Sequence, residues 1–443
     1  MIHNDTIVAP ATPSGGAIAI VRLEGERAIE IADSLVRTSS GKRLAEMEGN
    51  RLTHAEIYDH TRRIDDVVVS LFRAPHSYTG GDMVEIACHG SAFIVSEITR
   101  LAIEQGARTA TAGEFTKRAF LAGKLDLSQA EAVADVIAAE ERAALTLADT
   151  QLRGGYSASL ASLRGELVHL ASLLELELDF SEEDVEFADR KRLVALLDGT
   201  ASEIARLAAS FATGNAIKRG IAVAIVGKPN VGKSTLLNRI VGDERAMVSD
   251  IAGTTRDTIE ESVRIDGVVF RFVDTAGVHT TEDQLERLGI ERTHKALREA
   301  QIVIELFDAV GDDIVEVQEG QHLLRVLNKC DLTPDIALPE GWIAISARYG
   351  EGVDELLRKL RASIDTESVM RGETVISSTR HYEALVRANE ALVRTRDGLT
   401  SGLPTDLVAQ DLREVLSSIG EITGEVTSTD LLSEIFSKFC IGK

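Results

Sequence analysis

The chain of 443 residues has few of the features that mark secreted or membrane proteins. Its three cysteines, Cys88, Cys330 and Cys440, lie far apart, which argues against a disulfide framework and against a metal site with cysteine ligands. Its apolar runs are no longer than strands, whereas a membrane-spanning helix needs roughly 18 apolar residues. The start, MIHNDTIVAP, has no basic segment followed by an apolar core, so no secretory signal is expected. We therefore predict a cytoplasmic protein with no membrane partner.

Basic side chains are scarce relative to acidic ones. The chain has 48 Lys and Arg against 71 Asp and Glu, a formal net charge of -23. Phosphate binding depends on clustered Lys and Arg, so this surface repels nucleic acid on average. Any RNA partner must meet a local basic patch or be presented by another protein.

Proline is absent from a long stretch. All seven prolines lie outside the interval between Pro75 and Pro229, which leaves that interval free of the strongest helix breaker. The spacing of leucines within it predicts a helix packed into a bundle core, with a self-pairing coiled coil as the alternative. A second helical block begins near Arg380 with Leu385, Ala388 and Leu392. The leucines in the first block are Leu160, Leu163, Leu167, Leu170 and Leu174.

Strands and helices alternate differently before and between these blocks. GAIAIVRLEG and DDVVVSLFRAP read as strands and SEITRLAIEQGA as a helix, so the first 120 residues are expected to form an α+β module. From about Ile221 to Leu360, apolar strands alternate with helical stretches, as in a doubly wound, mostly parallel sheet. The predicted fold class is therefore multidomain α/β: an α+β module, a helical bundle and an inserted doubly wound domain.

The inserted domain opens on a phosphate-binding loop. IAVAIV reads as a buried strand, and GKPNVGKS follows it from Gly227 to Ser234. Glycines let backbone N–H groups converge on phosphate oxygens, Lys233 supplies a cation to the β- and γ-phosphates, and the Ser234 hydroxyl can bind Mg²⁺. The loop residues predicted to bind GTP are Asn230, Val231, Gly232, Lys233, Ser234 and Thr235.

Three further motifs follow in the order that a GTPase requires. DTAG from Asp274 can hold Mg²⁺ through water, and its Gly277 can approach the γ-phosphate. In NKCD, Asp331 can accept two hydrogen bonds from guanine that adenine cannot offer, and Lys329 can lie along the base. ISAR can close over the base through backbone amides. The predicted GTP-binding residues are Asp274, Thr275, Ala276, Gly277, Asn328, Lys329, Asp331, Ser346 and Ala347.

A predicted switch loop, SDIAGTTRDTIEE, lies between the first two motifs. A threonine here can complete the Mg²⁺ shell when a γ-phosphate is present, with Thr255 the candidate and Thr254 next. Position 278, after DTAG, is Val and not the glutamine that orients water in Ras-like enzymes, so hydrolysis must orient water otherwise. The predicted GTP-binding residues of this loop are Ser249, Asp250, Ile251, Ala252, Gly253, Thr254 and Thr255.

The whole chain resembles the tRNA modification GTPase family MnmE/TrmE. The similar segments include GKPNVGKSTLLN, DIAGTTRD, DTAGVHTTEDQLERLGIER, SYTGGDMVEIACHG, AGEFTKRAFLAGKLDLSQAEAVADVI and the terminal FCIGK. The resemblance implies that two G domains dimerise across their nucleotide faces and that a K⁺ ion takes the place of an arginine finger. It implies K⁺ ligands at Asn230, Ser249, Ile251 and Thr254, and a water held by Glu286. The implied catalytic residues are Glu286, Asn230, Lys233 and Cys440.

The resemblance also implies a folate site, a partner and a domain plan. The first module would form a homodimer and bind a 5-formyl- or methylene-tetrahydrofolate through Arg22, Glu85, Lys124 and Lys443, with Cys440 nearby. With the flavin protein MnmG, in a heterotetramer or larger complex, the family forms a carboxymethylaminomethyl or aminomethyl group on wobble uridine of certain tRNAs. The expected domains are the folate-binding module at 1–120, helical parts at 121–215 and 369–443, and the G domain at 216–368.

Two departures and two rivals accompany this interpretation. Glu305 lies within the apolar run IVIELFDA, where a carboxylate is costly unless it reaches solvent or a partner. The segment GDDIVEVQEGQHLLRV is short, so a trimmed loop and helix are expected before the guanine motif.

The rival function is a GTP-switched RNA or ribosome assembly factor of the Era or Der kind, yet neither a GXXG loop module nor a second G domain is found. A membrane-remodelling GTPase would need an anchor that the sequence lacks.

Overall fold

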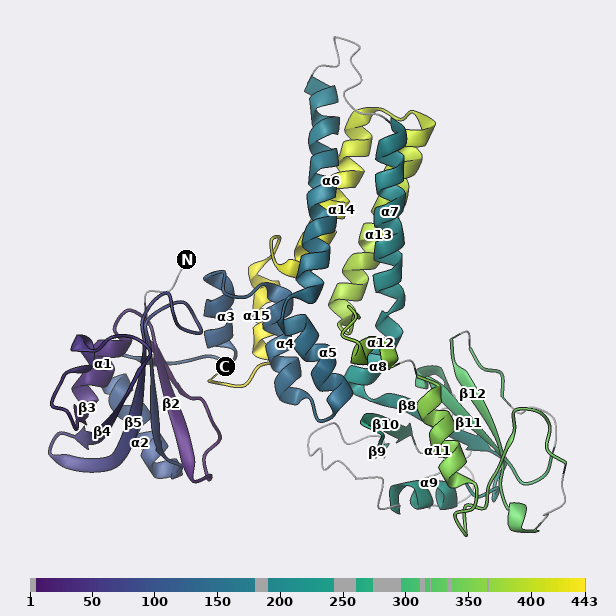
Figure 1. Ribbon diagram of the computed structural model, residues 1–443, viewed down its shortest axis with the longest axis horizontal. Helices are drawn as coiled ribbons and strands as arrows, with labels where there is room; N and C mark the ends of the chain where they lie inside the picture. The colour runs from purple at the N-terminus through teal and green to yellow at the C-terminus, as the bar shows by residue number, and fades with distance from the viewer. Residues whose placement is uncertain are drawn as a thin grey trace, which may run out of the picture. The chain divides into compact units, whose positions relative to one another are not determined.

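The computed structural model divides the chain into two compact units, which Figure 1 shows with their elements labelled. The first unit contains residues 1–134 and 420–443, and the second contains residues 135–419. The residues that the structure describes are 5–179, 190–242, 260–273, 296–310, 315–318, 320–332, 337–364 and 366–442.

A seven-stranded sheet in the order β3-β4-β5-β6-β2-β1-β7 organises the first unit. Neighbouring strands are antiparallel except for β1 and β7, which are parallel. Buried and more exposed residues alternate along β5, as expected for a sheet covered on one face. The strands are β1 (Ile7–Pro10), β2 (Ile18–Glu24), β3 (Val36–Thr38), β4 (Arg51–Asp59), β5 (Arg62–Phe72), β6 (Met83–His89) and β7 (Arg108–Thr109).

Helices α1 (Ala28–Leu35) and α2 (Ala92–Glu104) pack on this sheet, and their apolar faces share one core with the buried residues of its strands. A short 3-10 helix, Leu44–Glu46, adds Leu44 to that core. A second core joins the start of α4 (Leu127–Ala138) to α15 (Thr429–Ser437). Helix α3 (Glu114–Leu121) precedes α4.

The carboxyl-terminal tail is fixed to the beginning of the chain. Ile441 forms an antiparallel bridge with Ala112. Gly442 has φ 98, and a Cβ there would lie 2.0 Å from the backbone oxygen of Pro10, so only glycine fits. The last residues of the sequence therefore complete the unit that the first residues begin.

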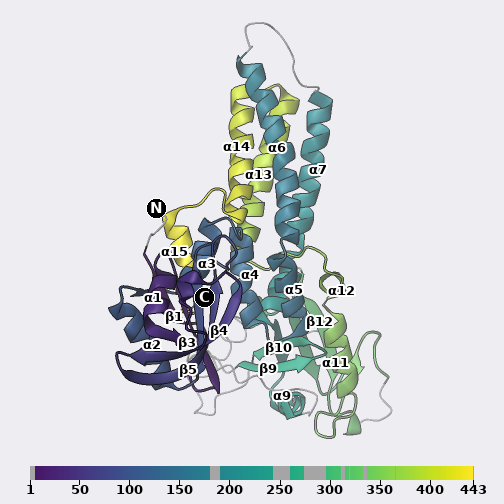
Figure 2. The same cartoon turned by 60° about the vertical axis from the view of Figure 1, so that its left-hand side comes forward.

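Four long helices of the second unit lie alongside one another in both Figure 1 and Figure 2: α6 (Gly155–Asp179), α7 (Arg190–Ala209), α13 (Thr379–Ser401) and α14 (Thr405–Thr423), whose last residues belong to the first unit. The predicted leucine stripe is confirmed as bundle core, since Leu160, Leu167, Leu170 and Leu174 are buried and Leu163 is partly buried. Shorter helices are α5 (Arg142–Leu152), α8 (Phe211–Arg219) and α12 (Glu367–Met370).

The predicted doubly wound domain is confirmed as a six-stranded sheet in the order β13-β12-β11-β8-β10-β9. All neighbours are parallel except β10 and β9. Helices α9 (Lys233–Gly242) and α11 (Val353–Ala362) share the apolar core of this sheet, and so do α5 and α8. The strands are β8 (Ile221–Gly227), β9 (Glu260–Ile265), β10 (Val268–Val273), β11 (Ile302–Phe307), β12 (His322–Leu327) and β13 (Ile343–Ala344).

Glu305 has one partner on a neighbouring strand and one in the segment that follows β11. It is fully buried in β11, where one carboxylate oxygen accepts a hydrogen bond from the backbone N–H of Val315 at 3.0 Å. The Nε of Arg325, on the neighbouring strand β12, lies 3.8 Å from the other oxygen. These contacts offset the cost of burial, and β11 pairs with both β8 and β12 despite the carboxylate.

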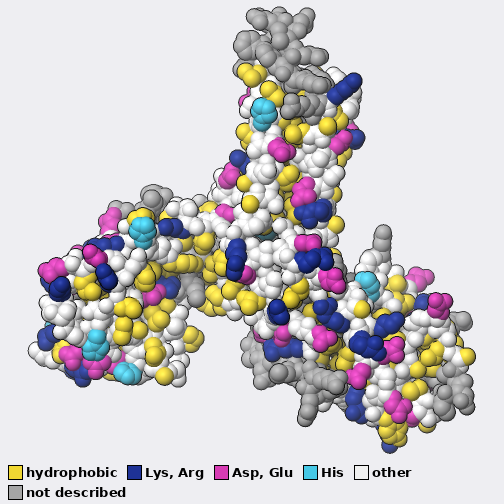
Figure 3. Space-filling view, in the orientation of Figure 1, with side chains coloured by type: hydrophobic (Ala, Val, Ile, Leu, Met, Phe, Trp, Pro, Cys, Tyr) yellow, Lys and Arg dark blue, Asp and Glu magenta, His cyan; other side chains and the backbone are white. Residues whose placement is uncertain are grey.

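Charges of both signs are interspersed on the face that Figure 3 shows, where Lys and Arg side chains lie beside Asp and Glu. Ion pairs on the bundle follow this pattern, such as those of Arg394 with Asp411 and Glu414. Among the described residues, no helix combines the length and apolar character needed to cross a bilayer.

Candidate functional site

The phosphate-binding loop connects β8 to α9. Strand β8 is buried along its first six residues, as its unbroken apolar run predicts. Asn230 and Gly232 both have positive φ, 63 and 105. A Cβ on Gly232 would lie 2.3 Å from Nδ2 of Asn328, so glycine allows the guanine loop to approach. The loop therefore turns sharply into α9, whose N-terminus favours an anion.

Lys233, the first residue of α9, bends back over this loop. Its Nζ donates to the backbone oxygens of Gly227 at 2.9 Å and Lys228 at 3.1 Å. Ser234 and Thr235 follow in the first helical turn and are exposed. The amine and the Ser234 hydroxyl thus lie where phosphate oxygens and a cation would be bound.

Asn328 connects three of the predicted nucleotide-binding segments. Its side-chain Nδ2 donates to the backbone oxygen of Val231 at 2.8 Å, and its Oδ1 accepts from the backbone N–H of Ala347 at 2.9 Å. Asn328 is 3% exposed and the neighbouring Ser346 is fully buried. The amide therefore holds the phosphate loop and the ISAR loop together.

Two other residues of the guanine motif lie at this junction. Lys329 donates through Nζ to the backbone oxygen of Asn230 at 3.0 Å and lies 3.4 Å from Asp308. Asp331 lies in a short 3-10 helix, Cys330–Leu332, and is exposed. Its carboxylate is thus accessible to a base placed beside Lys329.

The structure leaves the remaining predicted nucleotide residues untested. Among the described residues, it brings together the phosphate loop, the guanine motif and the ISAR loop. The site residues outside the described part of the chain are Ser249, Asp250, Ile251, Ala252, Gly253, Thr254, Thr255, Asp274, Thr275, Ala276, Gly277, Glu286 and Lys443.

In the first unit, Arg22 and Glu85 form an ion pair across β2 and β6. Nη2 of Arg22 lies 2.7 Å from Oε1 of Glu85, and Nε donates to the same oxygen at 2.9 Å. Nη1 of Arg22 donates to the backbone oxygen of Gly442 at 3.2 Å. The guanidinium lies 5.9 Å from the ring centre of Tyr78 and 5.4 Å from that of Phe115. Two predicted folate residues and the tail therefore meet at one point.

Lys124 and Cys440 each form a hydrogen bond with another segment of the first unit. Nζ of Lys124 donates to the backbone oxygen of Pro75 at 2.6 Å, in the loop that also carries Tyr78. Cys440 is exposed, and its backbone oxygen accepts from the N–H of Gly113 at 3.4 Å. The thiol is therefore carried on the tail segment that Arg22 holds two residues further on.

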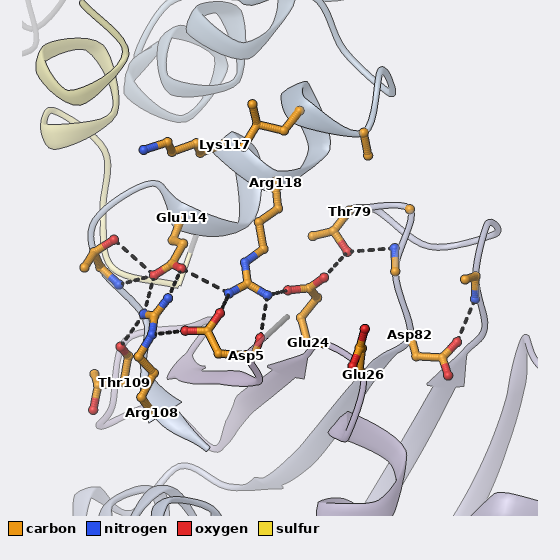
Figure 4. Close-up of a pocket in the computed structure, with 17 residues that line it drawn as sticks. Asp5, Glu24, Glu26, Thr79, Asp82, Arg108, Thr109, Glu114, Lys117 and Arg118 are labelled. Atoms are coloured by element: carbon orange, nitrogen blue, oxygen red, sulfur yellow. Dashed lines mark hydrogen bonds and ion pairs between the residues drawn. The ribbon is translucent and has the colours of Figure 1, made fainter. Parts of the chain in front are cut away.

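A cavity of about 980 Å³ lies in the same unit, with α3 on one side (Figure 4). Two arginines and three carboxylates form an ion-pair network along it. Arg118 contacts Asp5, Glu24 and Glu114, while Arg108 contacts Asp5 and Glu114. Lys124 lies at its margin, because a Cβ on the lining residue Gly80 would come within 3.3 Å of Lys124 Cε.

The pKa values of two carboxyl groups in this network are shifted in opposite directions. Burial alone would raise the pKa of Glu114, but hydrogen bonds from Arg108 and the backbone N–H of Thr111, with the charge of Arg118, lower that pKa to about 2. For Glu24, burial outweighs the attraction of Arg118 and raises the pKa. The cavity wall thus contains one strongly ionised and one more easily protonated carboxyl group.

The sequence did not single out these network residues. Asp5, Glu24 and Arg108 come from separate segments, and no motif joins them to α3. The available signal was the pair Glu114 and Arg118, four residues apart within AGEFTKRAF, which is helical ion-pair spacing.

Family models and full-length relatives all match this chain to the same family. The family model for the MnmE helical domain matches residues 127–440, and that for the GTP-binding protein TrmE N-terminus matches residues 6–124. The tRNA modification GTPase MnmE of Flavobacterium johnsoniae is 46% identical over 466 residues, and that of Bacteroides fragilis is 46% identical over 465 residues. Each alignment covers 100% of both chains.

A solved G domain, that of the T. maritima FeoB iron transporter, is 23% identical with a TM-score of 0.25, covering 32% of this chain and 98% of that chain. The full-length relatives and the two family models confirm the resemblance expected from the sequence. The chain belongs to the tRNA modification GTPase MnmE family.

Proposed function

We propose that the protein is a K⁺-dependent GTP hydrolase that acts with MnmG on the wobble uridine of certain tRNAs. The product would carry a carboxymethylaminomethyl or aminomethyl group whose one-carbon unit comes from tetrahydrofolate. The GTPase part of this proposal is supported by the side chain of Asn328, which is hydrogen-bonded to the phosphate loop at Val231 and to the ISAR loop at Ala347. Membership of the family supports the tRNA part.

The described residues of the nucleotide site fit GTP and its cations. Ser234 offers an exposed hydroxyl oxygen, the kind of ligand that Mg²⁺ prefers, with Thr255 as the second protein ligand. The exposed side-chain amide of Asn230 forms no hydrogen bond among the described residues, so its oxygen is available to K⁺. Ser249, Ile251 and Thr254 would complete the K⁺ shell. Bound K⁺ would supply positive charge to the transition state, and Glu286 would orient water.

The first unit supports folate binding by its chemistry. Glu85 can accept N–H donors of a pterin, and Arg22 and Lys124, with Lys443, can pair with glutamate carboxylates. Arg22 pairs with Glu85 and lies 5.9 Å from the centre of the partly exposed Tyr78 ring, which offers a flat ligand apolar surface beside charge. Cys440 would lie near this ligand.

The same proposal covers assembly and domain organisation. The folate-binding module would occupy residues 1–120 and form a homodimer, and the G domain would occupy 216–368 between helical parts at 121–215 and 369–443. The complex with MnmG would be a heterotetramer or larger, in the cytoplasm. MnmG could carry much of the tRNA binding, which suits a chain with a net charge of -23.

The test is wobble-uridine analysis of tRNA from a strain that lacks the protein. We expect the modified nucleoside to disappear, to return with the full-length wild-type chain, and to remain absent with Lys233→Ala. Asn238→Ala, exposed on α9, serves as the matched control and should restore it. An unchanged nucleoside profile in the deletion strain, with no redundant enzyme present, would refute the proposal. Strong GTP turnover in Na⁺ without folate binding would favour an assembly factor.

A further inference from the structure

An arginine of the phosphate-binding helix is bonded to the backbone of the ISAR loop. Arg239 lies in the last turn of α9, and its Nε donates to the backbone oxygen of Ala347 at 3.3 Å. Its Nη2 donates to the backbone oxygen of the next residue, Arg348. A guanidinium presents its N–H donors in a fixed planar arrangement, so one side chain can bind two successive carbonyl groups at once.

Two side chains hold Ala347 between them. The loop closes on itself where the backbone N–H of Gly350 donates to the oxygen of Ser346 at 2.7 Å. Within this closed turn, the N–H of Ala347 donates to the side chain of Asn328 at 2.9 Å, and its oxygen accepts from Arg239. Both backbone groups of Ala347 are therefore fixed, one from the guanine motif and one from α9.

The bond from Arg239 also determines where the following N–H group points. The peptide bond between Ala347 and Arg348 is trans, so its C=O and N–H point in opposite directions. Because Arg239 binds the Ala347 oxygen, the N–H of Arg348 is directed away from Arg239. Among the described residues, no hydrogen bond reaches this N–H. It is therefore a donor that remains available to an acceptor on a bound base.

The other end of the same helix carries residues predicted to bind phosphate and Mg²⁺. Lys233 and Ser234 begin α9, and Arg239 lies six residues after Lys233, which is about 9 Å along the helix axis. One short helix thus contacts both ends of the predicted nucleotide site: its first turn faces the phosphates, and its last turn holds the loop that closes over the base.

We propose that Arg239 is a positioning residue for guanine recognition, an inference that rests on the proposed function. Arg239 holds the ISAR loop so that the N–H of Arg348 donates to O6 of the base. Adenine has an amino group in place of O6, and two donors cannot pair, so the positioned N–H favours guanine. This contact complements Asp331, which accepts from the N–H groups of guanine.

The experiment measures nucleotide affinity of the full-length protein by competition with GDP that carries a fluorescent label on its ribose. The competitors are GDP and 2-aminopurine riboside diphosphate, which keeps the 2-amino group but lacks O6 and the N1 proton. Arg239→Ala should weaken GDP binding by about tenfold, the effect of losing one well-placed hydrogen bond. Binding of the analogue should stay within about twofold, because it has no O6 contact to lose. The missing N1 proton affects every variant alike, so the ratio of the two affinities isolates the contact with O6.

Two further variants distinguish positioning from a general effect on the domain. Arg239→Lys keeps the positive charge on α9 but replaces the planar guanidinium by a single ammonium group, so it should restore part of the GDP affinity. Arg358→Ala removes an exposed arginine from α11, which shares the core of the same sheet. Arg358 forms no hydrogen bond or ion pair among the described residues, so this variant should bind both nucleotides as the wild type does.

The outcomes separate the inference from the proposed function. Unchanged GDP affinity in Arg239→Ala, or an equal loss for GDP and the analogue, would overturn the role of Arg239, since equal loss is what a general loosening of the domain produces. If circular dichroism shows that Arg239→Ala does not fold, the same comparison with Arg239→Lys decides, with an expected loss specific to GDP of about threefold. A wild-type protein that binds neither nucleotide would instead refute the proposed function.

Discussion

The side-chain amide of Asn328 donates to the backbone oxygen of Val231 at 2.8 Å, across 97 residues of sequence. Through this bond, a residue named in the guanine motif also determines where the phosphate loop lies. The other end of the same amide holds Ala347 of the ISAR loop. A single side chain therefore links the two loops that are predicted to hold the opposite ends of the nucleotide.

Asn328→Ala should weaken GDP binding by about 10- to 100-fold, because buried partners left without a hydrogen bond cost about 1–3 kcal/mol. The sole tryptophan, Trp342, packs at a tilt against Phe307 at the end of β11, with ring centres 4.6 Å apart, and its fluorescence offers a titration signal. Asn238→Ala, exposed on α9, is the control. Unchanged affinity in Asn328→Ala would show that the loops keep their positions without the amide.

Asp331→Asn should change the preferred base. The carboxylate would accept hydrogen bonds from two N–H groups of guanine, whereas an asparagine amide can donate to the 2-oxo group of xanthine. We expect GDP affinity to fall by about 100-fold or more and xanthosine diphosphate affinity to rise, since unmatched polar groups are strongly rejected. Competition binding of the two nucleotides measures the exchange. Equal loss for both nucleotides would place Asp331 outside base recognition.

GTP turnover should depend on K⁺ through Asn230. We expect at least a tenfold higher kcat in K⁺ than in Na⁺ at equal ionic strength, since a cation at the developing charge is worth several kcal/mol. Asn230→Ala should remove this difference, and it should lower GDP affinity much less than kcat, since alanine only strains the loop at a positive φ. Turnover that is equally fast in both salts would contradict the proposed K⁺ site.

Glu114 should stabilise the first unit in a pH-dependent manner. Its pKa is lowered from 4.5 to about 2, so its stabilisation is complete above pH 4.5 and is lost as the pH falls through about 2. At pH 7, Glu114→Gln should lower the free energy of unfolding by about 3 kcal/mol, because it removes the charge-assisted hydrogen bonds that lower this pKa, and each pKa unit corresponds to about 1.4 kcal/mol. Urea titration followed by circular dichroism measures the effect. Glu30→Gln, at an exposed ion pair, should change nothing measurable.

The sequence was most informative where function depends on consecutive residues. The phosphate loop, NKCD and ISAR could be found without a structure because each of these motifs has a local chemical requirement, and Asn328 shows that they meet. The leucine stripe likewise predicted the bundle core, since helical spacing alone decides which side chains share a face.

The features that the sequence did not predict depend on contacts between residues that lie far apart in the sequence. Asp65 and His89 are 24 positions apart, and only the pairing of β5 and β6 brings them together. Arg108 and Asp5 meet because β7 pairs with β1, which no composition or spacing reveals. Glu305 suggested a packing cost, yet its partners Val315 and Arg325 were not evident before the strand order was known.

The close fit of Gly442 against Pro10 has a consequence for biosynthesis. Pro10 is synthesised well before Gly442, because the second unit lies between them in the sequence. Because domains generally fold as units in order of synthesis, the second unit can fold while the first still lacks residues 420–443. A truncated or stalled nascent chain would then display a nucleotide-binding domain attached to a first unit that has its sheet but lacks α15 and the tail.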